Sequence, residues 1–292
     1  MKRVLAVDGG GMKGFCPCAM LIELERRIGK PCSQYFDLIA GTSVGGILAL
    51  LLSIGFPAAK ALEFFTVDGP DIFQKHWWRR HGVFMPRYPA KRIEGILQKR
   101  LGDQTLKDCQ TKVLVTAFDL VARNAFFFKN FDDAPDYSLW QVARATSAAQ
   151  TFFPAFPLDA MILWDGGNEA NNPSMCAYAD AIKLWGDAER IKLLSIGCGF
   201  SPIQYAAKKL VRCGMIRNGA ASLEVLFDAG SDVTDYQMEQ MLGPDYFRIQ
   251  PSFAEPTGMD DASPEGLEML QRNATQCVTR YSAVLDRYIR LM

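Results

Sequence analysis

The sequence predicts an α/β fold with three layers, in which helices cover both faces of a mostly parallel central sheet. Short apolar runs of strand length alternate along the chain with longer stretches of helical spacing. Two of these runs end in glycine-rich turns that lead directly into a helical stretch. Such alternation is typical of a parallel sheet whose crossover helices lie on both faces.

The first strand and helix are predicted from the start of the chain. Residues 4–7 are a short apolar run of buried-strand character, and a glycine-rich loop follows. A helix is predicted over 15–28, because its apolar residues recur at spacings of three and four. These apolar positions are Met20, Leu21, Leu24 and Ile28.

The later elements continue the alternation. Apolar runs of strand length stand at 36–40, 112–118, 125–128, 160–164 and 191–196. Helices are predicted over 47–52 and 173–185, and a final helix is predicted from the apolar positions between 267 and 285. We interpret these elements as scaffold.

Composition is consistent with one large domain. With 292 residues, 49% of them hydrophobic, the chain can bury a sizeable core. We expect a single domain over 1–292, with the chemical motifs within 3–200 and a helical completion over 201–292. The 32 basic residues balance 32 acidic ones, so no net field favours nucleic acid and no nucleic-acid partner is expected.

A sharp turn that carries a serine follows the run 36–40. The motif is Gly41-x-Ser43-x-Gly45, and an apolar helical stretch begins at once. In such an elbow the glycines are required, because side chains two positions from the serine would strike the crossing backbone. Ser43 is therefore predicted at the N-terminus of a helix, where developing negative charge is favoured.

No conventional histidine base accompanies this serine. The two histidines are His76 and His81, and no acid-bearing motif lies between them and the elbow. A carboxylate can serve as the base where geometry and pKa allow it. Asp165 is the best candidate, because it closes a short apolar strand and only Gly166-Gly167 follows it. On these residues alone, an ordinary strand-end Asp-Gly turn stays an alternative.

The segment 8–14 is a glycine-rich loop between a strand and a helix. Its backbone N–H groups can converge on an anion, either a phosphate or a tetrahedral oxyanion. The spacing Gly9-x-Gly11-x-x-Gly14 matches a dinucleotide fingerprint, but Asp8 would stand beside the pyrophosphate. The loop also resembles the phosphate loop of actin-like sugar kinases, where a hairpin strand follows instead of the helix predicted here. Because the loop itself is similar, a sugar kinase stays the alternative function.

Taken in order, the motifs 8–14, 41–45 and 165–167 resemble the patatin-like phospholipase family. The flanking segments 143–154 and 171–173 agree with its bacterial members, and the resemblance covers residues from about 3 to about 200. It implies a patatin-like α/β/α fold. It also implies a lipid acyl hydrolase of the phospholipase A type, which cleaves fatty acyl esters of membrane phospholipids through an acyl-enzyme.

The resemblance assigns a role to each motif. Ser43 is the implied nucleophile and Asp165 the implied base. The implied oxyanion hole consists of the amides of Gly9, Gly10, Gly11 and Val44. Support of the loop and the elbow is implied for Asp8, Lys13, Gly14, Gly41, Gly45, Gly166 and Gly167. No cofactor or metal is implied.

Three positions depart from the family pattern without touching the Ser-Asp pair. Lys13 stands where many members carry arginine, which keeps the charge but loses the planar fork. Gln150 stands where proline is expected, and Cys198 stands where threonine is usual. These departures put in question only whether Lys13 orders the loop as arginine would.

The cysteines and the hydropathy suggest a location. Eight cysteines are scattered without metal-ligand spacing, so reduced thiols are expected. The N-terminal apolar run is too short for a signal peptide, and the stretch 47–54 is far short of the roughly 20 residues that a membrane span requires. We expect a cytoplasmic protein with peripheral contact at the inner membrane face.

The segment 64–88 interleaves aromatic and basic side chains. Such a pattern suits the headgroup boundary of a bilayer, and part of the segment is predicted to be a mobile cap that contacts membrane. The alternative is that its aromatic residues cover the core.

Two questions about function stay open in the sequence. Some bacterial members of the family are effectors switched on by cyclic dinucleotides, and no motif here decides between such an activator and constitutive activity. A non-catalytic lipid or nucleotide sensor that keeps the fold is a further alternative function.

Overall fold

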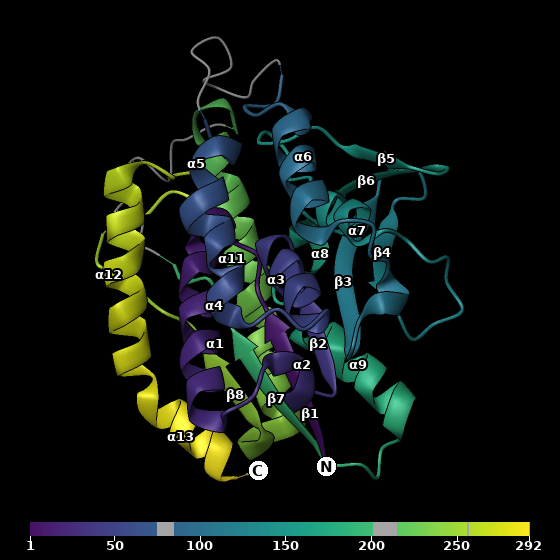
Figure 1. The fold of residues 1–292 in the computed structure, drawn as a ribbon, viewed down its shortest axis with the longest axis vertical. Helices are drawn as coiled ribbons and strands as arrows, with labels where there is room; N and C mark the ends of the chain where they lie inside the picture. Colours follow the sequence, from purple (N-terminus) through teal and green to yellow (C-terminus); the bar gives the residue numbers. More distant parts are fainter. Residues whose placement is uncertain (75–84, 201–214, 256, 292) are drawn as a thin grey trace.

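One sheet organises the part of the chain that the structure describes (Figure 1). The computed structural model describes residues 1–74, 85–200, 215–255 and 257–291, with only the backbone described over 215–224. The sheet has eight strands in the order β5-β6-β3-β2-β1-β7-β8, and β4 also pairs with β3. The predicted α/β fold is confirmed.

The parallel part of the sheet runs from β3 through β2, β1 and β7 to β8. Its strands are β1 (Lys2–Val7), β2 (Leu38–Gly41), β3 (Lys112–Asp119), β7 (Ile191–Ile196) and β8 (Tyr246–Ile249). Three antiparallel strands extend it beside β3, namely β4 (Asn124–Lys129), β5 (Phe156–Leu158) and β6 (Met161–Asp165).

Helices form a layer on each face of the sheet. One face is covered by α1 (Phe15–Ile28), α3 (Val44–Ser53), α7 (Leu139–Thr146) and α12 (Pro264–Arg280). The opposite face is covered by α9 (Ser174–Trp185) and α11 (Met215–Leu242). Figure 1 shows α12 outside α1 and α13 (Ser282–Arg290) below it.

The strands alternate between two separate apolar clusters. In β1, Leu5 and Val7 pack in the cluster of α1, α3 and α12, whereas Val4 and Ala6 pack in that of α9 and α11. Both sets are fully buried. A strand buried on both faces reads as a continuous apolar run, which is why β1 was predictable from its residues.

Shorter elements connect the layers. They are η1 (Gly11–Gly14), α2 (Cys32–Tyr35), α4 (Ala58–Ala61), the π-helix η2 (Phe64–Asp68), α5 (Gly69–Ile72), α6 (Ala90–Leu101), η4 (Leu106–Asp108), α8 (Gly167–Ala170) and η5 (Gly243–Asp245). The helix α3 continues the predicted run 47–52 back to the serine elbow.

The C-terminal region differs from its predicted helical character. It contributes β8 to the sheet as well as helices, and the final helix is divided into α12 and α13 at Tyr281. The Tyr281 hydroxyl donates a hydrogen bond to the carbonyl oxygen of Gln250, just after β8, at 2.6 Å. This contact ties the break between the helices to the end of the strand.

Two predictions concern residues outside this description. His76, His81 and three basic residues of the proposed cap, Lys75, Arg79 and Arg80, fall within 75–84, whereas the fourth, Arg87, is described and pairs with Asp260. Among the described residues, no helix combines the length and the apolar character needed to cross a bilayer.

Candidate active site

The elbow after β2 holds Ser43 in a strained conformation. Its φ of 54° and ψ of −124° are rarely adopted by residues other than glycine. The flanking glycines make the turn possible, because a Cβ at Gly45 would strike the carbonyl oxygens of Val7 and Asp8. A Cβ at Gly41 would likewise strike the backbone of Gly45.

A threonine fixes the elbow from a neighbouring helix. The Ser43 N–H donates to the Thr146 hydroxyl, at the end of α7, at 2.8 Å. The hydroxyl of Thr42 donates to the carbonyl oxygen of Ala170 at 2.6 Å and accepts from Thr116 on β3 at 2.8 Å. These contacts lock both residues of the turn, so that the Ser43 side chain is presented at the carboxyl end of the sheet.

The sheet brings the serine and the aspartate together. On β3, β2 pairs with residues 112–115 and β6 pairs with residues 117–119. Because β4 pairs with 114–119 and overlaps both, β2 and β6 share the opposite edge of β3. They run toward each other along that edge, so the turn after Gly41 meets Asp165 at the end of β6.

The Ser43 hydroxyl donates a hydrogen bond to Asp165 Oδ2 at 2.6 Å. The other oxygen, Oδ1, accepts from the Gly167 N–H at 2.8 Å. A Cβ at Gly166 would collide with Thr116, so this turn also requires glycine. The carboxylate is thus oriented by one hydrogen bond on each oxygen.

Burial shifts the pKa of this carboxylate. Asp165 is 2% exposed and forms no ion pair among the described residues. Burial raises its pKa to about 7, against the lowering effect of the hydrogen bonds from Ser43 and the Gly167 amide. A carboxylate with such a pKa can accept a proton near neutral pH. A serine hydroxyl that is hydrogen-bonded to it can therefore be activated as a nucleophile.

The glycine loop lies beside the serine, at the end of β1. The Gly9 N–H donates to the carbonyl oxygen of Asn171 at 3.1 Å. Within the described residues, the amides of Gly10 and Gly11 donate to no other segment, and both residues line the same pocket as Ser43. Val44 lines it too, and its amide, the first of α3, has no acceptor inside the helix.

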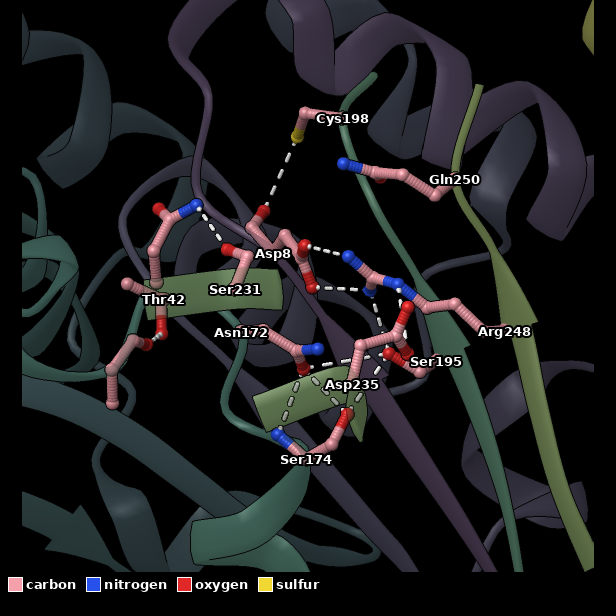
Figure 2. Close-up of polar contacts among 12 residues, drawn as sticks. Asp8, Thr42, Asn172, Ser174, Ser195, Cys198, Ser231, Asp235, Arg248 and Gln250 are labelled. Atoms are coloured by element: carbon pink, nitrogen blue, oxygen red, sulfur yellow. Dashed lines mark hydrogen bonds and ion pairs between the residues drawn. The ribbon is translucent and has the colours of Figure 1, made fainter. Parts of the chain in front are cut away.

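The loop is held by residues from far along the chain. The Met12 N–H donates to the carbonyl oxygen of Met259 at 2.8 Å. The Asp8 carboxylate pairs with Arg248 of β8 (Figure 2). Gly14 packs against Val44 and Phe65, where a side chain would not fit.

Lys13 occupies the other side of the loop. It is 8% exposed and lines a smaller polar pocket with Asp228 and Gln250, not the pocket that holds Ser43. Its ammonium makes no hydrogen bond or ion pair with any described residue. Lys13 contacts the loop through its backbone, because its N–H donates to the carbonyl oxygen of Gly10 at 3.2 Å.

An apolar pocket opens above the serine and the aspartate. It encloses about 790 Å³, including space open to solvent. Aromatic and aliphatic side chains dominate its walls: Met12, Val44, Ile47, Phe64, Phe65, Ile72, Phe73, Ile93, Phe152, Phe153, Phe227 and Met259. Four of these side chains belong to the segment 64–88 and face the pocket, namely Phe64, Phe65, Ile72 and Phe73. A long acyl chain fits such walls.

Several contributors were not predicted. Thr146 and Asn171 stand in segments that the family resemblance had marked without a role. Met259 and Arg248 belong to the C-terminal region, where the sequence shows no motif. These two residues could not be found from a local pattern, because each contacts the glycine loop from more than a hundred residues away in the sequence.

The fold and the site define a class of protein: a lipid ester hydrolase with a serine elbow on an α/β/α sheet. A sequence model of the patatin-like phospholipase family matches residues 5–178, and the chain belongs to this family. The loop also leads into helix α1, and β1 pairs in parallel with β2. The hairpin of a sugar-kinase phosphate loop is therefore absent at this position.

Similar proteins come from plants and animals. Patatin-like protein 2 of Oryza sativa subsp. indica is 29% identical, over 92% of this chain and 82% of its own length. The human calcium-independent phospholipase A2-gamma is 27% identical, over 99% of this chain and 40% of its own. The probable inactive patatin-like protein 9 of Arabidopsis thaliana is 31% identical, over 85% of this chain and 74% of its own.

A solved structure shares the fold. VipD from Legionella pneumophila superimposes with a TM-score of 0.57 at 13% identity, and the match covers 98% of this chain and 67% of that one. At this identity the likeness concerns the arrangement of the sheet and its helices.

Proposed function

We propose that this protein is a lipid acyl hydrolase that cleaves fatty acyl esters of phospholipids through an acyl-enzyme. Ser43 is the proposed nucleophile and Asp165 the proposed base. The observation that carries the proposal is the 2.6 Å hydrogen bond between them at the base of an apolar pocket. The matched phospholipase A2-gamma supports the substrate class by its name.

In the first step, Ser43 attacks the ester carbonyl carbon and its proton passes to Asp165. The C–O π bond breaks, and the negative charge on the former carbonyl oxygen is stabilised by the amides of Gly10, Gly11 and Val44. The carboxylic acid formed at Asp165 then returns the proton to the leaving alkoxide, which departs as the lysolipid alcohol. The acyl group stays on Ser43.

In the second step, water attacks the acyl-enzyme. Asp165 takes a proton from the water, and the same amides stabilise the second oxyanion. Collapse breaks the bond to Ser43, which regains a proton, and the fatty acid is released. Gly9 is absent from the proposed donors, because its amide already donates to Asn171. We therefore propose three donor amides for the oxyanion hole in place of the four that the sequence predicts.

The acyl chain is proposed to lie in the apolar pocket. Burial of each methylene contributes on the order of 0.8 kcal/mol, so a pocket lined by aromatic residues favours long chains over short ones. Specificity should therefore increase with chain length until the pocket is filled.

The proposed substrate lies in a membrane, and peripheral contact is part of the proposal. Val67 and Met85 are exposed, although neighbouring side chains of the segment 64–88 line the pocket. Reversing the charges of Arg79 and Arg80 should weaken binding to anionic vesicles several-fold and leave hydrolysis of a soluble short-chain ester nearly intact. Equal losses in both assays, or none in either, would count against membrane contact through these residues.

Covalent labelling tests the function directly. A fluorophosphonate should label the wild-type protein at Ser43 and should not label Ser43→Ala. Fatty acid release from phosphatidylcholine vesicles should be lost in the same variant. A wild-type protein that is folded but neither labels nor releases fatty acid would indicate a non-catalytic sensor instead.

A further inference from the structure

A buried ion pair connects the glycine loop to the far edge of the sheet. Arg248 donates from Nη1 to Asp8 Oδ1 at 2.9 Å and from Nη2 to Oδ2 at 2.6 Å. Asp8 is 1% exposed, and the Arg248 side chain is 9% exposed. Such a two-pronged, charge-assisted pair fixes direction as well as distance.

The arginine reaches its partner across an intervening strand. β8 pairs with β7, and β7 pairs with β1. The guanidinium passes over Ser195 of β7 and donates to its hydroxyl at 2.7 Å. Burial acts to lower the pKa of Arg248, but the charge and the hydrogen bonds of Asp8 outweigh it and raise that pKa.

A polar network holds Ser195, the serine that accepts from the Arg248 guanidinium. The Ser174 hydroxyl donates to Ser195 Oγ at 2.9 Å and lies 2.5 Å from Asn172 Oδ1, within hydrogen-bond distance. On the outer side, Arg248 Nε lies 3.6 Å from a carboxylate oxygen of Asp235. Figure 2 shows these residues converging on the Asp8-Arg248 pair. The guanidinium is therefore itself fixed in place.

The backbone of Asp8 is held by the same region. The Cys198 thiol donates to the Asp8 carbonyl oxygen at 3.2 Å, and the Asp8 N–H donates to the carbonyl oxygen of Ile196 at 3.1 Å. Side chain, carbonyl and amide of this one residue are all fixed, and Gly9–Gly11 follow immediately. Because glycines have no side chains to anchor them, Asp8 sets where the loop starts and how it points.

We infer that Arg248 is a positioning residue for the oxyanion hole: it orients the Gly10 and Gly11 amides by clamping Asp8. This inference rests on the proposed function. Arg248 lies beyond residues 5–178, the part that the family model matches, so the last third of the chain completes the reacting end of the site. A 1 Å displacement of such groups can cost on the order of a hundredfold in rate.

The control is a second Arg-Asp pair, which lies at the starts of β7 and β8. Arg190 donates two hydrogen bonds to Asp245 at 2.8 Å each, just before β7 and β8 begin, and its side chain is 61% exposed. Arg190→Met removes a pair with the same two-pronged hydrogen bonding, but one that is exposed and far from the loop. Comparison with Arg248→Met therefore separates loss of any ion pair from loss of this one.

The kinetic test compares Arg248→Met, Arg248→Lys and Arg190→Met on a soluble ester. We expect Arg248→Met to lower kcat roughly a hundredfold with KM changed by less than about twofold. Arg248→Lys should recover part of the loss, and Arg190→Met should behave like the wild type. The apparent pKa of the pH profile should stay near 7 in all three variants, because Asp165 is untouched.

Hydrogen–deuterium exchange of the peptide that covers residues 8–14 measures positioning without turnover. Exchange there should increase in Arg248→Met and stay unchanged in Arg190→Met. If Arg248→Met does not fold, Ser195→Ala, which removes the hydroxyl that supports the guanidinium and keeps the Asp8-Arg248 pair, should show the same pattern at a smaller size. Unchanged exchange and kcat in the folded variants would overturn the inference.

The two proposals fail in different ways. If the wild-type protein neither labels at Ser43 nor hydrolyses an ester, the proposed function fails, and exchange over residues 8–14 still decides whether Arg248 positions the loop. If the wild type is active and Arg248→Met changes KM as much as kcat, or lowers only the melting temperature, Arg248 is structural and the inference is wrong.

Discussion

Two aspartates at strand ends, Asp8 after β1 and Asp165 at the end of β6, show how a partner decides what a buried carboxylate does. Both are almost completely buried, and both precede glycines. Asp8 faces a guanidinium that donates two hydrogen bonds. Asp165 has no cation in the described structure and accepts from a hydroxyl and an amide.

The difference in hydrogen-bond partners distinguishes a carboxylate that anchors the backbone from one that is proposed to accept a proton. At Asp8 burial also raises the pKa, but there the charge and the hydrogen bonds of the Arg248 guanidinium act in the opposite direction. At Asp165 only neutral donors oppose burial, and the pKa rises to about 7. A base requires a proton affinity suited to neutral pH, whereas an anchor requires a tight fixed partner. We therefore propose different roles for the two aspartates, with Asp165 in the apolar pocket as the base and Asp8 in the neighbouring polar pocket as the anchor.

The largest expected effect is at the Ser43-Asp165 pair. Ser43→Ala and Asp165→Asn should each lower kcat for ester hydrolysis by on the order of 10⁴ or more, because one loses the nucleophile and the other the base. Near-ultraviolet circular dichroism should show that both variants stay folded. An active Ser43→Ala protein would remove the basis for the chemical role of this pair.

The second effect is the pH dependence of activity. Because the ionised form of Asp165 is the proposed base, kcat/KM should fall about tenfold per unit as pH decreases below about 7. Glu169 is the control, since burial and then the charge of Asp165 raise its pKa to about 8. In Glu169→Gln the profile should keep its inflection. If the inflection disappears, Glu169 and not Asp165 controls activity.

A smaller effect is expected at Asp8. Asp8→Asn keeps a hydrogen-bond acceptor for Arg248 but removes the charge, so kcat should fall roughly tenfold as the loop loosens. The inflection of the pH profile should not move. A loss as large as that of Asp165→Asn would mean that the two aspartates cannot be divided into anchor and base.

The smallest effect is on stability. Between pH 4 and pH 7 the folded protein keeps a proton on Asp165 that the unfolded chain releases, so the free energy of unfolding falls as pH rises. Asp165→Asn carries no such titrating proton, so its free energy of unfolding does not fall with pH for this reason. Its melting temperature relative to the wild type should therefore be higher at pH 8 than at pH 5, by about several degrees. An equal difference at both pH values would show that Asp165 is not held with a raised pKa.

Local patterns predicted most of the scaffold. The strands β1, β3 and β7 and the helices α1 and α9 were expected within one or two residues, because long buried runs and helical periodicity are local signals. The strands β5 and β8 were not expected, since three or four residues carry too little pattern. The helix break at Tyr281 depends on a contact with Gln250 that no local signal contains.

The site was predictable as a set of residues and not as an assembly. The elbow and the glycine loop are visible because a strained turn and a close backbone approach exclude side chains, and that exclusion leaves glycines in the sequence. The pairing of Ser43 with Asp165 could be proposed from motif order. What the sequence could not show is that Gly9 is engaged by Asn171, or that Lys13 lies on the other side of the loop.

By itself, the sequence determined the fold class and the family, and it supplied the short list of proposed reacting groups, because each depends on the local backbone. The tertiary structure decided the rest. Only the sheet register places Ser43 against Asp165, and only the crossing from β8 to β1 gives Asp8 its arginine. Ion pairs and pKa values depend on which distant groups share a buried space, and that is a property of the folded chain.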